Sequence, residues 1–249
     1  MSQSSRAKPT PMEAFEDNLA DARCLVQRVE GFTNRRSRRM RKELRQRVGN
    51  ALNVPARDHG DLDCLESDDV FLIFKPGSSL SREDFLDHDP LLRQALVAGC
   101  AAFETYVADW VLARVGAQLI SGALTSRAAD IPMTLGMWMD IHDRYTQKKR
   151  GLRKNVIEPF VYERASTAPK PLGELMSLIG VKDWARTIDQ ARRCPRGTTV
   201  ADLERINKRR NRIAHRGDRD GRGRATITLD YVASELDVLQ AVAEAMDTL

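Results

Sequence analysis

Hydrophobic positions recur with helical spacing along most of the chain. Residues 12–29 keep this spacing throughout, and Gly31 is expected to end that helix. Residues 91–115 are apolar around most of the helical circumference, which predicts a helix buried on most of its faces. Further helices are expected at 135–145, 171–180, 182–193 and 230–246. The pattern therefore predicts an all-α protein.

The N-terminal third gives weaker patterns. Residues 1–10 are rich in Ser, Pro and Lys and are expected to be unstructured. Residues 35–52 predict a second helix, in which apolar residues recur at every fourth position beneath an arginine-rich surface. Residues 70–74 form a short apolar run before Pro76, and both a strand and a loop remain open there.

A helix close to the C-terminus combines an apolar stripe with polar groups. At about 100° per residue, the stripe has an arginine, Arg210, in its middle. The apolar members of this stripe are Leu203, Ile206, Ile213 and Ala214. Residues 199–202 offer an N-cap, and Gly217 offers a helix stop.

Polar groups with phosphate chemistry lie along the same helix. Asn207, Asn211 and His215 follow at intervals of four, so they form a row at the edge of the stripe. An arginine in a core position needs a carboxylate or a phosphate as a partner. Histidine exchanges a proton readily near neutral pH. Together these residues indicate phosphoryl-transfer chemistry.

The motif Arg210-Asn211-x-x-x-His215 resembles the R-N-x-x-x-H signature of HEPN domains, which are helical, metal-independent ribonucleases. The helix 91–115, with Phe103-Glu104-Thr105-Tyr106 inside it, resembles a core helix of the RiboL-PSP-type HEPN branch. Residues 184–188 and the closing helix fit the same branch. The resemblance covers residues 88–249, and the helix 12–29 would join the same bundle. Residues 1–87 are otherwise interpreted as a basic helical extension.

The resemblance implies roles for individual residues. His215 would act as general acid or base, Arg210 would clamp the phosphate, and Asn211 would orient either of them. Asn207 would support them. Glu104 is the single charged residue between positions 94 and 108, and it would neutralise or position Arg210. The alternative for Glu104 is an ion pair with an arginine other than Arg210. The implied products are a 2′,3′-cyclic phosphate and a 5′-hydroxyl, with neither metal nor cofactor.

Positive charge is concentrated locally. The net charge is +5, but residues 35–47 alone contribute +7. Two further basic clusters lie at 144–154 and 205–224. The expected RNA-binding residues are Arg35, Arg36, Arg38, Arg39, Arg209, Arg212 and Arg216. A solvated helical face or a partner-binding arm is the alternative for residues 35–47.

Composition limits the compartment and the chemistry. The four cysteines are widely spaced, which predicts neither a zinc site nor a disulfide framework. The N-terminus lacks the apolar core of a secretory signal, and no apolar run was expected to reach the roughly 18 residues of a membrane span. A cytoplasmic protein that binds no membrane is therefore expected.

Partners follow from the geometry of the motif. Arg210 and His215 lie about 140° apart around an ideal helix, so a symmetric homodimer is expected to combine two copies of the motif helix in one cleft. RNA is the expected substrate, and a tRNA loop would suit. The resemblance implies a toxin or antiviral effector, with an antitoxin or defence complex as a partner. A catalytically silent HEPN scaffold that binds RNA or protein, or a nuclease kept latent, remains open.

Overall fold

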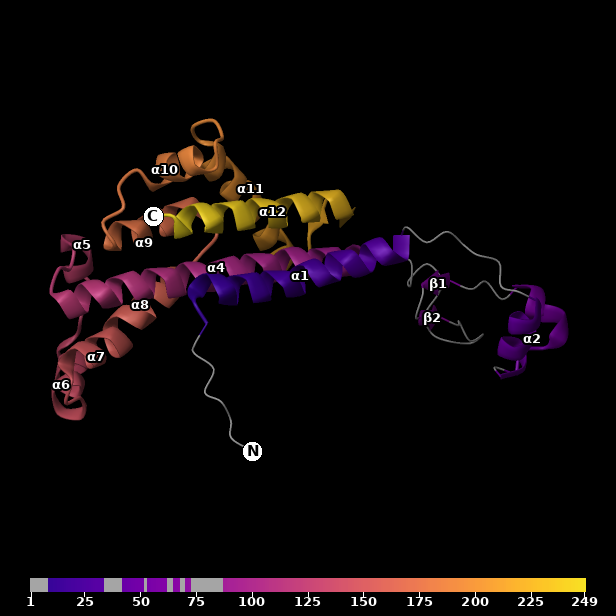
Figure 1. Ribbon diagram of the computed structural model, residues 1–249, viewed down its shortest axis with the longest axis horizontal. Helices are drawn as coiled ribbons and strands as arrows, with labels where there is room; N and C mark the ends of the chain where they lie inside the picture. The colour runs from indigo at the N-terminus through magenta and orange to yellow at the C-terminus, as the bar shows by residue number, and fades with distance from the viewer. Residues whose placement is uncertain (1–8, 34–41, 52, 62–64, 68–69, 73–86) are drawn as a thin grey trace.

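The computed structural model describes residues 9–33, 42–51, 53–61, 65–67, 70–72 and 87–249. These residues are mostly helical (Figure 1), which confirms the predicted all-α class. The helices are α1 (Pro11–Thr33), α2 (Lys42–Ala51), η1 (Ala56–Asp61), α4 (Asp89–Ser121), α5 (Ser126–Ala129), α6 (Leu135–Arg144), α7 (Lys148–Leu152), η2 (Arg153–Ile157), α8 (Glu158–Arg164), α9 (Pro169–Leu178), α10 (Trp184–Ala191), α11 (Thr198–Arg216) and α12 (Leu229–Asp247). Two short antiparallel hairpins pair β1 (Leu65–Ser67) with β2 (Val70–Leu72) and β3 (Arg219–Asp220) with β4 (Gly223–Arg224).

The core is built around α4. Helix α1 lies beside part of α4, and α12 packs on both helices (Figure 1). Aromatic side chains fill the contact between α1 and α4. The ring of Phe15 lies 5.2 Å from that of Tyr106 and 6.4 Å from that of Phe103. The Tyr106 hydroxyl donates to the Ala243 carbonyl of α12 at 3.0 Å. Burying each aromatic contributes roughly 1.5 to 3 kcal/mol, so α1 is an integral part of the bundle.

The apolar character of α4 is explained by this packing. By length and composition α4 could span a membrane, contrary to the expectation that no segment would. However, 67% of its most apolar stretch is buried inside the protein. Helices α1, α8, α9, α11 and α12 all contact it. This burial is typical of the central helix of a bundle.

Two predicted boundaries change. The first helix continues through Gly31 to Thr33. The central helix continues to Ser121 and ends at Gly122, which has the left-handed φ of 79° that favours glycine.

The basic stretch after α6 is helical rather than a linker. Helix α7, the π-helical turn η2 and α8 continue one another and lead away from α4, with α6 at their far end (Figure 1). A Cβ at Gly151 would come within 2.9 Å of the side chains of Ile141 and Tyr145. Glycine therefore allows α7 to approach α6 closely. We call α6, α7 and η2 the arm.

Candidate functional site

The N-terminus of α11 is capped by a side chain from the preceding helix. Asp189 of α10 accepts hydrogen bonds from the backbone N–H groups of Gly197 (2.6 Å) and Thr199 (2.8 Å). Burial alone would raise the pKa of Asp189, but hydrogen bonding with the Thr199 side chain, together with these backbone hydrogen bonds, outweighs it and lowers the pKa below its usual 3.8. The predicted cap at residues 199–202 is wrong, because the helix has already begun at Thr198. Asp202 instead accepts hydrogen bonds from Arg192 and Arg205, both at 2.9 Å.

The C-terminus of α11 ends at Gly217, as predicted, with a left-handed φ of 59°. The next residue, Asp218, also has a left-handed backbone and is completely buried. Its carboxylate accepts hydrogen bonds from Arg93 Nε (3.1 Å), Arg209 Nη2 (2.7 Å) and Arg212 Nε (2.9 Å). We call these four residues the Asp218 cluster.

The Asp218 cluster joins three parts of the bundle. Arg93 belongs to α4 and also donates to the Ala225 carbonyl at 3.0 Å. Arg209 belongs to α11 and donates to the Thr226 carbonyl at 2.9 Å. One carboxylate therefore holds the start of α4, the end of α11 and the chain entering α12. Arg93 also pairs with Asp89 at 3.0 Å, so three guanidinium groups share two carboxylates and leave one positive charge in excess.

A second carboxylate, Glu104, connects α4 with the middle of α11. Glu104 Oε2 accepts a hydrogen bond from Arg210 Nη2 at 2.9 Å. Glu104 Oε1 accepts from the backbone N–H and the hydroxyl of the buried Thr167, at 3.2 and 3.0 Å. The two oxygens thus have different partners, and the carboxylate is fixed in orientation. One turn earlier, burial and then the Glu104 charge raise the pKa of the Cys100 thiol to about 12, so Cys100 is a neutral neighbour.

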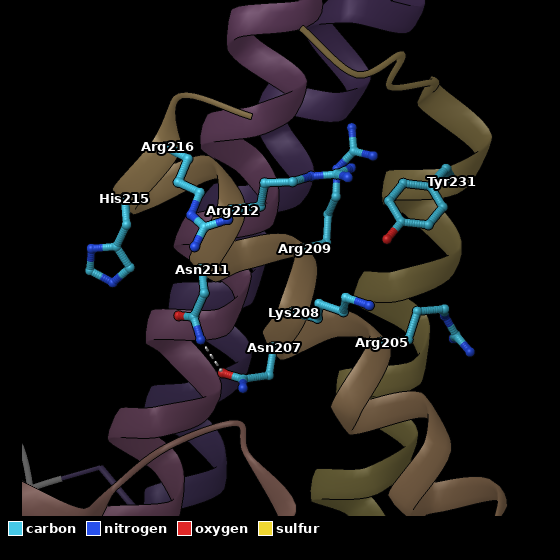
Figure 2. Close-up of a pocket in the computed structure, with 9 residues that line it drawn as sticks. All are labelled: Arg205, Asn207, Lys208, Arg209, Asn211, Arg212, His215, Arg216 and Tyr231. Atoms are coloured by element: carbon cyan, nitrogen blue, oxygen red, sulfur yellow. Dashed lines mark hydrogen bonds between the residues drawn. The ribbon is translucent and has the colours of Figure 1, made fainter. Parts of the chain in front are cut away.

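Arg210 and the polar row share hydrogen bonds. Arg210 Nη1 donates to Asn211 Oδ1 at 3.0 Å. Asn211 Nδ2 in turn donates to Asn207 Oδ1 at 3.3 Å (Figure 2). The Arg210 side chain is 26% exposed, so the guanidinium lies at the rim of the core. His215 is exposed and points away from Arg209 and Tyr231 (Figure 2).

The exposed side of α11 forms one wall of a groove of about 770 Å³. Tyr231 of α12 contributes to it, and burial, followed by the nearby Glu235 carboxylate, raises the pKa of this phenol to about 12. The lining residues are Arg205, Asn207, Lys208, Arg209, Asn211, Arg212, His215, Arg216 and Tyr231 (Figure 2). None of these nine is acidic, so the groove favours an anionic ligand.

A protein-family model described as RiboL-PSP-HEPN matches residues 69–249. The chain belongs to the RiboL-PSP-HEPN family. This membership indicates a nuclease or RNA-binding HEPN domain. Comparison with curated proteins found no match, and comparison with solved structures found none either.

Within the HEPN domain, the structure brings together most of the residues that the motif singled out. Asn207, Asn211 and His215 all line the groove, and Arg210 lies behind them with Glu104. The stripe is shorter than predicted. Leu203 and Ile206 are fully buried, Ile213 is partly buried, and Ala214 is exposed because the end of α11 leaves the core.

The expected RNA-binding residues have different surroundings. Arg209, Arg212 and Arg216 all line the groove. Arg209 and Arg212 also donate hydrogen bonds to Asp218, and Arg216 is exposed. Residues Arg35, Arg36, Arg38 and Arg39 lie outside the described residues, so their role stays a prediction. Among the residues that the structure describes, no three His, Cys, Asp or Glu side chains come together to hold a metal ion.

Several functional candidates of the HEPN domain could not be found from sequence. Arg93 and Asp218 are 125 positions apart, and nothing in the local pattern pairs them. Thr167 lies in a polar loop without helical spacing. Tyr231 follows the last predicted loop, and its place in the groove depends on how α12 packs against α11.

Proposed function

We propose that this HEPN domain is a metal-independent endoribonuclease in which Arg210 and His215 act on the scissile phosphate. The observation that carries the proposal is the groove itself, where Asn211 and His215 of the R-N-x-x-x-H motif lie beside five cationic side chains and no lining residue is acidic. RNA supplies its own nucleophile, the 2′-hydroxyl, so the protein needs to supply proton transfer and charge stabilisation.

The reaction follows from the two side chains. The 2′-oxygen attacks phosphorus, the bond from phosphorus to the 5′-oxygen breaks, and a 2′,3′-cyclic phosphate and a 5′-hydroxyl result. The His215 imidazole acts as general acid or base for one of the two proton transfers, removal of the 2′ proton or protonation of the leaving 5′-oxygen, and water carries out the other. Arg210 stabilises the charge on the phosphate oxygens. The Arg210 side chain is 26% exposed, so part of the guanidinium remains accessible to a phosphate.

A homodimer completes this site. Arg210 faces Glu104 on α4, while His215, about 7.5 Å further along α11 and about 140° around it, faces solvent. A single copy therefore does not direct both groups at one phosphorus atom. The exposed end of α11, including the small Ala214, leaves room for a second copy of the helix about a two-fold axis. The Arg210 of one protomer then meets the His215 of its partner.

The biological setting is part of the same proposal. A nuclease of this kind fits a cytoplasmic toxin or antiviral effector that cuts cellular or phage RNA, tRNA included. An antitoxin or defence-complex partner would control it. These roles depend on the family and on the groove, not on any further contact in the structure.

The first test is cleavage of a defined RNA by the purified protein in the presence of a chelator. Wild type should leave 2′,3′-cyclic phosphate ends, and His215→Ala should be slower by about 10² to 10⁴ fold. A matched RNA with one 2′-deoxy nucleotide at the cut site should resist. Equal cleavage by His215→Ala would refute the assignment, and RNA binding without cut ends would assign a silent scaffold.

The second test asks whether the site is shared. Arg210→Ala and His215→Ala should each be inactive alone, and mixing them should restore activity, because a mixed dimer keeps one intact pair. Their double variant, mixed with wild type, is the control. Persistent inactivity of the mixture, with mixed dimers demonstrated by tagged subunits, would place the site within one protomer.

A further inference from the structure

The arm carries exposed groups that the groove does not use. All six cations between residues 144 and 154 are exposed, and this stretch contains no acidic residue. Two of them are neutralised, since Arg144 pairs with Asp140 at 3.5 Å and Arg153 pairs with Glu158 at 3.4 Å. The remaining four are Lys148, Lys149, Arg150 and Lys154.

Two of these four lysine and arginine residues have structural contacts, and two do not. Lys148 donates to the carbonyl of His142 at the end of α6, and Lys149 donates to the Ile120 carbonyl at the end of α4. Arg150 and Lys154 make no side-chain hydrogen bond or ion pair with the described residues. Their charges are therefore available to a ligand.

The same arm carries an exposed aromatic surface. The Trp138 ring is 49% exposed and stacks on the His142 ring, with 5.2 Å between centroids and 10° between planes. Helix α6 buries a single residue, Ile141. Behind the arm, a hollow of about 570 Å³ lies between α7 and the end of α4, and Lys148 and Arg150 are among its lining residues. A flat aromatic face and unpaired cations on one element are the combination that holds single-stranded nucleic acid.

We propose that the arm binds a single-stranded segment of the RNA substrate that flanks the cut site. An unpaired base stacks on Trp138, and its neighbouring phosphates lie against Arg150 and Lys154. This inference rests on the proposed ribonuclease function. Glu104 and Ile120 are both on α4 and are separated by 16 residues, or about 24 Å along a straight helix. Helix α4 thus sets the distance between the groove and the arm. Only an RNA long enough to span this distance binds more tightly because of the arm.

Charge favours RNA over a protein partner. Exposed Leu135 and Met139 lie on α6 near Trp138, and an apolar helix face can also bind protein. However, the cores of protein interfaces are depleted of lysine, and Arg150 and Lys154 form no ion pair with the described residues. Phosphate supplies that complement along every nucleotide.

The test compares a short RNA that fills only the cleft with two longer RNAs, extended on the 5′ or on the 3′ side. Trp138→Ala should raise KM for one extended RNA about tenfold, leave kcat unchanged, and leave the short RNA unaffected. Arg150→Gln with Lys154→Gln should flatten the dependence of log KM on log salt by about 1 to 1.5 for the same extended RNA. Lys182→Gln with Arg186→Gln, two exposed cations elsewhere, removes the same charge and is the control.

Three outcomes overturn the inference. These are unchanged KM for both extended RNAs, equal losses on short and extended RNA, and equal losses in the control variant. Binding of single-stranded RNA, followed by fluorescence anisotropy with the same variants, separates this inference from the cleavage proposal. If wild type binds but does not cut, weaker binding by the arm variants still supports the arm while the nuclease assignment fails. If the arm variants bind RNA as well as wild type does, the exposed apolar side chains of α6 are instead assigned to binding a protein.

Discussion

Two of the carboxylates that hold α11, Asp218 and Glu104, differ in what surrounds them. Asp218 is completely buried and accepts from three arginines. Glu104 is 17% exposed on its side chain and accepts from one arginine, Arg210, which also remains partly exposed. The Asp218 carboxylate and its three arginines pair with one another inside the protein. The Glu104 arrangement leaves a guanidinium at the rim of the core, where it can meet an anion.

The difference indicates a division of labour along one helix. The Asp218 cluster fixes the direction in which α11 ends and therefore where His215 lies. Glu104 fixes Arg210, and its other oxygen is held by Thr167. We expect substitutions at Asp218 to act on stability and substitutions at Glu104 to act mainly on catalysis.

The largest expected effect is that of Asp218→Asn. Asparagine tolerates the left-handed backbone, but it removes the charge that three buried or half-buried guanidinium groups share. We expect a loss of about 3 to 5 kcal/mol in the free energy of unfolding, measured by urea denaturation. Asp220→Asn, at an exposed position in the same hairpin, is the control and should change little. Equal stability of the two variants would remove the cluster's structural role.

Glu104→Gln should separate positioning from stability. The amide keeps the shape of the side chain but no longer offers Arg210 a charged acceptor. We expect cleavage to slow about 10- to 100-fold, in line with the roughly 1.5 to 3 kcal/mol of a charged hydrogen bond, with a small change in melting temperature. Glu163→Gln, which removes an exposed carboxylate on α8, is the control. Normal cleavage by Glu104→Gln would show that Arg210 needs no partner.

Asp189→Asn tests the other end of α11 and its pH dependence. The folded pKa of Asp189 is lowered, so its stabilisation is present above about pH 4 and is lost as the pH falls through the folded pKa. We expect the variant to be less stable by about 1 to 2 kcal/mol at pH 7, and the difference should shrink below pH 4. Unfolding at several pH values, with Asp183→Asn as control, measures it. A difference that stays constant with pH would contradict the assignment.

The smallest expected effect is that of Gly217→Ala. No heavy atom lies within 4 Å of the added Cβ, so the cost comes from the left-handed φ of 59° and amounts to about 1 kcal/mol. Gly223→Ala, at a glycine with equally open surroundings and no positive φ, should be near neutral. Thermal melts of the two variants decide the comparison.

Local patterns predicted the elements well and their contacts less well. Helical spacing located α12 within one residue at each end and the starts of α1 and α4 within two residues, because burial of one face imposes a period on the sequence, but it ended α1 four residues and α4 six residues too early. It misplaced the cap of α11, because the capping carboxylate comes from α10. The link from Glu104 to Arg210 was expected because a lone charge in an apolar helix needs a partner, and the structure has that contact. Arg93 gave no comparable signal.

By itself, the sequence determined the helical class, the family and the motif on α11, since each is written in spacing along one segment. Tertiary structure alone decided that Arg209 and Arg212 share Asp218 with Arg93, that Tyr231 lines the groove, and that Arg210 pairs with Glu104 while His215 is exposed. The physical reason is that a hydrogen-bond partner or a groove wall depends on which segments meet in space. When two contacting residues lie more than a hundred positions apart, their contact produces no periodic pattern in the sequence.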